Sequence, residues 1–160
     1  MTSLLLMSAC TVSYKLNRAS IDYNTTKTIT IETFANRAAY QWAPMATMFN
    51  TTLSDTYNHQ TKLRQVKREG DLVLSGEITS YDQTNKSISA DGYSSMVQLK
   101  MTVKVKFTNN KKHTDDFDKS FSASREYDSS QQLSSVQEEL VQQMIDDIVD
   151  QIFNETVAKW

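Results

Sequence analysis

One stretch of the chain decides its fold: Val97-Gln98-Leu99-Lys100-Met101-Thr102-Val103-Lys104-Val105-Lys106-Phe107-Thr108. Apolar and polar residues alternate here without a break, and this period of two belongs to a β-strand with one face on a core. The polar segment 109–113 follows, and then Phe117, Phe121 and Ala123 alternate again. We therefore expect these two segments to pair as a long hairpin.

Two earlier segments carry a shorter version of the same pattern. Ile29 and Ile31 alternate with polar residues in Thr28–Phe34, which predicts the first strand. Residues 63–66 are the expected beginning of the second strand, which continues through 71–81 with its apolar residues on one face. Gly76 falls on that face, and a glycine inside a strand indicates a bulge or a close neighbour.

Two segments have helical periodicity. Pro44 suits the first turn of a helix, and the residues after it predict an amphipathic helix over 44–58, with apolar positions at Met45, Met48, Phe49, Leu53 and Tyr57. A continuous apolar stripe from Val136 to Val157 predicts a second, longer helix that ends near Lys159. Ser135 and Glu138 have the spacing of a capping box at its start.

The expected order of elements is β-α-β-β-β-α in a single domain. A sheet with one apolar face and two helices with apolar stripes can bury those surfaces against each other. We therefore expect an α+β fold, a two-layer sandwich in which a four-stranded sheet carries both helices on one face.

The composition excludes several classes of protein. A net charge of −2 argues against a nucleic-acid binder, and no window of about 18 apolar residues predicts a spanning helix. No Gly-x-Ser-x-Gly elbow or glycine-rich phosphate loop occurs, so we expect no enzyme and no cofactor. His59 and His113 are far apart, and the acidic residues at 115, 116 and 118 lack the glycine and closing glutamate of a calcium loop, so we expect no metal site.

The N-terminus contains the only cysteine, Cys10, after the segment Leu4-Leu5-Leu6-Met7-Ser8-Ala9. This segment resembles a bacterial lipobox, in which small residues precede a cysteine that becomes lipidated with acyl chains such as palmitate. We expect residues 1–9 to be a truncated lipoprotein signal peptide, residues 10–27 a lipidated tether and residues 28–160 a single domain. In enterobacterial lipoproteins an aspartate directly after the lipidated cysteine favours retention in the inner membrane. This chain has Thr11 at that position, so the absence of the aspartate favours the outer membrane. The alternative is a buried or incidental cysteine that follows a chance run of leucines.

This organisation, together with four further segments, resembles the LptE family of lipopolysaccharide-assembly lipoproteins, in the versions from Bacteroidetes-type bacteria. The segments are Phe34-Ala35-Asn36-Arg37-Ala38, Gly70 to Tyr81, Leu99 to Asn109, and Phe117 to Phe121 leading into Tyr127-Asp128-Ser129-Ser130. The resemblance runs from about Cys10 to Trp160, and it makes residues 28–160 an LptE-like domain.

The resemblance implies a role that the residue patterns alone do not. Members of the family plug and support the outer-membrane β-barrel LptD, with which they transport and assemble lipopolysaccharide. The expected partners are therefore an LptD-type barrel, lipopolysaccharide and the outer membrane, reached through the lipid anchor, with the domain in the barrel lumen or facing the periplasm. The alternative is a free-standing envelope lipoprotein that binds a lipid or small molecule in its own pocket.

Two sets of residues are candidates for contacts. Lys104, Lys106, Lys111 and Lys112 lie in a stretch without acids, and such lysines can bind lipid phosphates; the alternative is a solvated strand face. Tyr40, Trp42 and Trp160 lie outside the predicted core stripes or at their ends. Such aromatic residues can anchor a partner, or they can cap the core.

Overall fold

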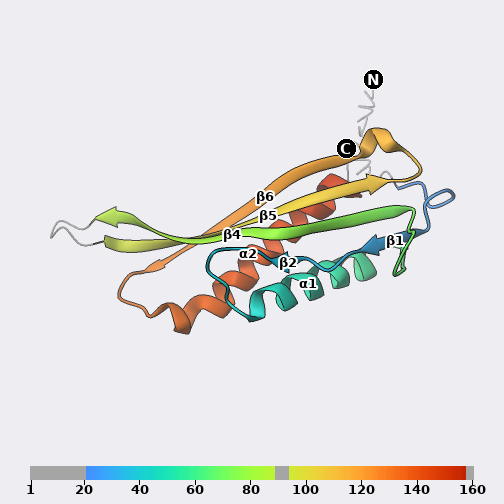
Figure 1. Ribbon diagram of the computed structural model, residues 1–160. Helices are drawn as coiled ribbons and strands as arrows, with labels where there is room; N and C mark the ends of the chain where they lie inside the picture. Colours follow the sequence, from blue (N-terminus) through green and yellow to red (C-terminus); the bar gives the residue numbers. More distant parts are fainter. Residues whose placement is uncertain (1–20, 89–93, 158–160) are drawn as a thin grey trace, which may run out of the picture.

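A computed structural model describes residues 21–88 and 94–157 of the chain. Its two layers are a long, twisted sheet and two helices, α1 (Pro44–Gln60) and α2 (Leu133–Thr156), which both lie on one face of the sheet (Figure 1). This confirms the predicted α+β sandwich. Cys10 and Trp160, the expected signal peptide and most of the expected tether lie outside the described residues.

The sheet has six strands among the described residues, where the sequence predicts four. The four main strands are β1 (Thr28–Ile31), β4 (Leu72–Ile88), β5 (Ser94–Asn109) and β6 (Phe117–Asp128), side by side in that order. The additional strands, β2 (Ala35–Asn36) and β3 (Arg64–Gln65), have two residues each. Such short strands leave no periodic pattern in a sequence. The prediction that residues 63–66 begin the second strand is therefore wrong, because residues 64–65 form the separate strand β3.

The central hairpin of β4 and β5 is antiparallel, and β6 continues it as a second antiparallel pair. On the other side, β1 and β2 both run parallel to β4, and β3 runs parallel to β1. Between β5 and β6 the short 3₁₀ helix η1 (His113–Asp115) makes the turn. The expected pairing of the segment at 97–108 with the segment at 117–123 is confirmed.

The core lies between the two layers. The apolar residues of β5 are all buried on the helix side, from Val97 to Phe107. On α1 and α2 the buried residues recur every three or four positions, and they form one cluster with the strands. Ile21 and Tyr23, which precede β1, also pack against this cluster.

The helix ends differ in detail from the prediction. Helix α2 begins at Leu133, and no side chain caps its N-terminus, so the predicted capping box is wrong. Ser135 lies inside the first turn, where its hydroxyl donates to the Gln132 carbonyl at 2.7 Å. Helix α1 begins at Pro44 as predicted and continues two residues further than expected, to Gln60.

Gly76 has the close neighbour that its position in the strand suggested. A Cβ atom at this residue would collide with the Lys104 carbonyl oxygen of β5 and with the Phe34 ring. The bulge of β4 lies further along, because Ile78 pairs with Val103 whereas Ser80 pairs with Thr102. The extra residue shifts the alternation by one, which places Tyr81 on the buried face, so the core continues past the bulge.

Candidate interaction surfaces

The face of the sheet that the helices leave uncovered carries two of the four candidate lysines. Lys104 and Lys106 are exposed on β5, which places them opposite the packed core. They are not the isolated cations that the sequence indicated. Lys104 lies 3.4 Å from the Asp118 carboxylate of β6, and its register partner on β4 is Glu77. This face is therefore polar with mixed charge, because acids on both neighbouring strands flank the lysines.

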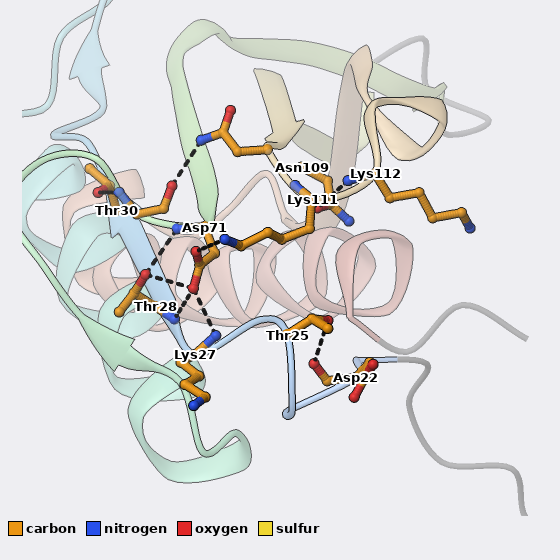
Figure 2. A network of polar contacts seen from close by, with 11 residues as sticks. Asp22, Thr25, Lys27, Thr28, Thr30, Asp71, Asn109, Lys111 and Lys112 are labelled. Carbon is orange, nitrogen blue, oxygen red and sulfur yellow. Dashed lines mark hydrogen bonds and ion pairs between the residues drawn. The ribbon is translucent and has the colours of Figure 1, made fainter.

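Lys111 belongs to a different structure, a polar network centred on Asp71 (Figure 2). One carboxylate oxygen of Asp71 accepts hydrogen bonds from the Lys27 N–H at 2.8 Å and from the Thr28 N–H and hydroxyl, both at 3.0 Å. The other oxygen lies 3.0 Å from the Lys111 ammonium group. The Lys27 N–H is the main cause that lowers the pKa of Asp71 well below its usual value, and Lys111 comes second.

The backbone route at Gly70 explains why Asp71 lies there. Residues 66–71 connect β3 to β4, which lie on opposite sides of β1, so the connection crosses the β1 backbone. At the crossing, a Cβ atom on Gly70 would lie 2.5–2.9 Å from backbone atoms of Ile29, Thr30 and Leu72. Only a glycine fits this approach, and it delivers Asp71 to the exposed backbone N–H groups at the start of β1.

Lys112 and Lys106 have carboxylates nearby as well. Lys112 lies 3.1 Å from Asp115 within the β5–β6 turn. The Asn109 N–H is the main cause that lowers the pKa of Asp116, and Lys106 adds a smaller effect through its charge. The structure thus divides the four lysines between the open sheet face and the turn at one end of the domain.

An open pocket of about 520 Å³ lies at this same end, where the described chain begins. Its lining includes Ile21 and Thr26 on one side and Lys111, Lys112 and Asp115 on the other. Cations and acids balance here, so the pocket has no clear preference for an anion.

The aromatic candidates separate into two kinds. Tyr40 is 51 % exposed, and it is the one large hydrophobic side chain among the described residues that is exposed. Its ring stacks on the Tyr81 ring, with 5.7 Å between the two ring centres and an interplanar angle of 22°. Trp42 is partly buried and packs against the core. Tyr40 therefore has the geometry of a contact residue, and Trp42 has that of a residue capping the core.

A second open pocket, of about 390 Å³, lies beside this stacked pair. Tyr40, Tyr81, Gln83, Leu99 and Leu133 contribute to its lining. Its polar groups are held in place, because Gln83 donates to the Tyr127 hydroxyl at 2.8 Å and Gln137 donates to the Tyr81 hydroxyl at 3.0 Å.

Of the residues that line this pocket, the sequence indicated only Tyr40 as a candidate contact residue. Tyr81 and Gln83 reach it because the bulge changes which residues of β4 face the helices. Nothing in the alternation of the β4 sequence marks that change. Leu133 belongs to the first turn of α2, which the predicted start of the helix left out.

Two further points concern the metal-binding side chains and the two helices. Within residues 21–88 and 94–157, no three metal-binding side chains gather as a metal site would need. His59 lies at the end of α1 and His113 in the turn before β6, as the two exposed histidines of the chain. Neither α1 nor α2 combines the length and the apolarity needed to cross a bilayer.

Several bacterial lipoproteins have the same fold. A minor lipoprotein from Acinetobacter baumannii is 16% identical, with a TM-score of 0.55 over 81% of this chain and 91% of its own. Rare lipoprotein B from Shewanella oneidensis is 14% identical, with a TM-score of 0.52 over 78% of this chain and 91% of its own. Lipoprotein B from Nitrosomonas europaea is 15% identical, with a TM-score of 0.54 over 79% of each chain.

Identities this low establish the fold alone. No curated protein sequence matches the chain significantly. The family model of LptE, described as lipopolysaccharide-assembly, matches residues 26–156, which include all the strands and helices described above. The chain therefore belongs to the LptE family of lipopolysaccharide-assembly proteins.

Proposed function

We propose that this protein is a lipid-anchored lipoprotein of the outer membrane that plugs and supports an LptD-type β-barrel during lipopolysaccharide transport. The family match over nearly the whole folded domain carries the proposal. The fold shared with bacterial lipoproteins agrees with it. In this proposal the protein binds and assembles, and it catalyses no reaction.

The lipid anchor is Cys10. Eleven residue steps separate Cys10 from Ile21, where the described domain begins. A segment of this length spans at most roughly 36–40 Å, so the anchor can sit in the bilayer while the domain lies well away from its surface. Several acyl chains on one cysteine hold a domain stably without a spanning segment.

The partner contact includes Tyr40. An exposed aromatic ring that is already fixed by stacking loses little side-chain entropy when a partner covers it, and such rings are typical anchors of interfaces. Trp42, two residues further along the chain, packs on the core. Trp160 stays a candidate for the same interface on the strength of the sequence alone.

Contact with lipopolysaccharide is assigned to the lysines. Lys104 and Lys106 lie on the open sheet face, where an exposed ion pair contributes little and exchanges readily for a phosphate. Lys111 and Lys112 remain candidates, although the bond of Lys111 to Asp71 also stabilises the fold. A free-standing carrier is less well supported, because both pockets described above are open depressions and the core between the layers is packed with side chains.

A pull-down from native outer membranes tests the partner. The full-length chain with an affinity tag should recover a β-barrel protein, and mass spectrometry should find acyl chains on Cys10. Tyr40→Ala should reduce recovery of the barrel, whereas Tyr40→Phe should retain it because the ring remains. A lipidated protein that is recovered as a monomer with no barrel refutes the proposal.

Binding of purified lipopolysaccharide tests the lysines separately. Replacing Lys104 and Lys106 by Ser should weaken binding, and a matched pair, Lys62→Ser with Lys67→Ser at the β3 side of the domain, should leave it unchanged. Further replacement of Lys111 and Lys112 needs a parallel check of stability, because Lys111 holds Asp71. Unchanged binding after replacement of all four lysines would discard this assignment.

A further inference from the structure

The two long edges of the sheet are protected differently. On β6, the residues opposite Thr102 and Lys100 are Ser122 and Ser124, and their backbone groups point away from β5. The Ser122 carbonyl accepts a hydrogen bond from the Gln151 side chain of α2 at 3.2 Å, and the Ser124 carbonyl accepts one from the Arg125 guanidinium at 2.9 Å. Side chains thus occupy this edge, as is common in proteins that avoid pairing with other strands.

The edge of β4 is open over its second half. Its neighbours on that side, β1 and β2, pair with it no further than Ile78, whereas β4 continues to Ile88. Figure 1 shows β4 running on past β2 in this way. Among the described residues, no strand covers this part of the edge, and the side chains of residues 82–86 are exposed.

The register identifies which backbone groups face outward there. The backbone groups of Ile78 face β2, because the Ile78 carbonyl accepts a hydrogen bond from the Arg37 N–H at 2.8 Å. The bulge then shifts the alternation by one residue, so that Ser80 and Asp82 turn their backbone groups toward β5. The N–H and C=O groups of Tyr81, Gln83 and Asn85 therefore point to the open side, and no described residue bonds to them.

The 390 Å³ pocket lies at this same open edge. Tyr81 and Gln83, which present their backbone outward, also line the pocket, and Tyr40 and Leu133 form other parts of its lining. A strand added beside β4 would place alternate side chains on the helix side of the sheet, where the pocket is. Backbone hydrogen bonds would give such a strand its affinity, and the pocket would select its side chain.

We propose that the edge of β4 at Tyr81, Gln83 and Asn85 accepts an extended segment of another protein as an added β-strand, with an apolar or aromatic side chain of that segment in the pocket beside Tyr40. The proposal rests on the proposed function in supposing a protein partner, and it specifies how that partner is held. The requirement for an extended polypeptide comes from the row of backbone groups that no described residue pairs with, because no flat protein surface or lipid satisfies such a row in this geometry.

Hydrogen exchange of the purified complex with its barrel partner tests the proposal. In the complex, the amides of Tyr81, Gln83 and Asn85 should exchange at least tenfold more slowly than in the free protein. The outward amides of Ser122 and Ser124 on β6 should exchange at the same rate in both. A complex that forms while the β4 amides keep their free rate refutes strand addition and leaves the proposed function intact.

Proline variants provide a second measurement. Asn85→Pro removes an outward N–H without removing a bond to β5, and it should weaken binding of the partner about tenfold. Ser122→Pro removes an outward N–H on the opposite edge and should leave binding unchanged. Equal effects of the two variants would overturn the proposal. Protection of the β4 amides in the free protein would also overturn the proposal. If the amides are protected at every protein concentration, the chain's own residues occupy the edge. If they are protected only at high concentration, a second copy of the chain occupies it.

Discussion

Replacing Asp71 by Asn should lower the free energy of unfolding by about 2 kcal/mol at pH 7. The carboxylate accepts three hydrogen bonds of 2.8–3.0 Å and pairs with Lys111. A hydrogen bond to a charged acceptor contributes about 1.5–3 kcal/mol and a neutral one about 0.5–1.5 kcal/mol, so each bond loses roughly 1 kcal/mol. Because the Asp71 side chain is 20% exposed, solvent screening reduces the sum of these losses to about 2 kcal/mol.

The dependence on pH distinguishes this cause from a general loss of packing. Because the pKa of Asp71 is lower in the folded protein than the ordinary value of 3.8, the stabilisation is complete above that value. It is lost as the pH falls below 3.8 toward the pKa of the folded state. The deficit of Asp71→Asn, which is its loss of unfolding free energy relative to the unchanged protein, should therefore be constant from pH 7 to pH 5. Below pH 4 it should shrink by at most about 1.4 kcal/mol per pH unit.

Urea unfolding followed by far-ultraviolet circular dichroism measures this deficit at pH 7, 5, 4 and 3. The midpoint of thermal unfolding should also fall by about 4–8 °C at pH 7. Asp118→Asn is a matched control, because it breaks the exposed ion pair with Lys104 and should change stability by less than about 0.5 kcal/mol. A deficit of Asp71→Asn that is no larger than the control, or one that persists unchanged at pH 3, would refute the reasoning.

Three further substitutions test the packing that positions the surfaces. Gly76→Ala should destabilise the protein by about 1–3 kcal/mol in urea unfolding, because the added methyl meets the Phe34 ring and a backbone carbonyl; an unchanged midpoint would contradict it. Asn50→Ala should cost about 2 kcal/mol by the same assay, since the Asn50 amide bonds both the N–H and the carbonyl of Phe34, and Asn50→Gln should not restore the loss. Gln137→Leu should leave the Tyr81 hydroxyl without its donor and lower thermal stability, whereas the same change combined with Tyr81→Phe should recover part of it.

The sequence alone determined the elements and their layers. The strict alternation at 97–108 could only be a half-buried strand, and the stripe from Val136 to Val157 could only be a helix with one buried face. Such patterns are local, since each residue reports the side of the element on which it lies. The exposure of Lys104, Lys106 and Tyr40 could be expected from the sequence for the same reason, and their roles as contact residues stay predictions.

The tertiary structure decided what those residues contact. The pairing of Lys111 with Asp71 joins residues 40 positions apart, and the crossing at Gly70 brings them together. The bulge that turns Gln83 toward the pocket depends on the register of β4 against β5, which no single segment specifies. Whether a sheet edge is open or guarded depends likewise on which distant side chain, such as Gln151, reaches it. These features are non-local, because a register or an ion pair is fixed only when both partners have been placed by the rest of the fold.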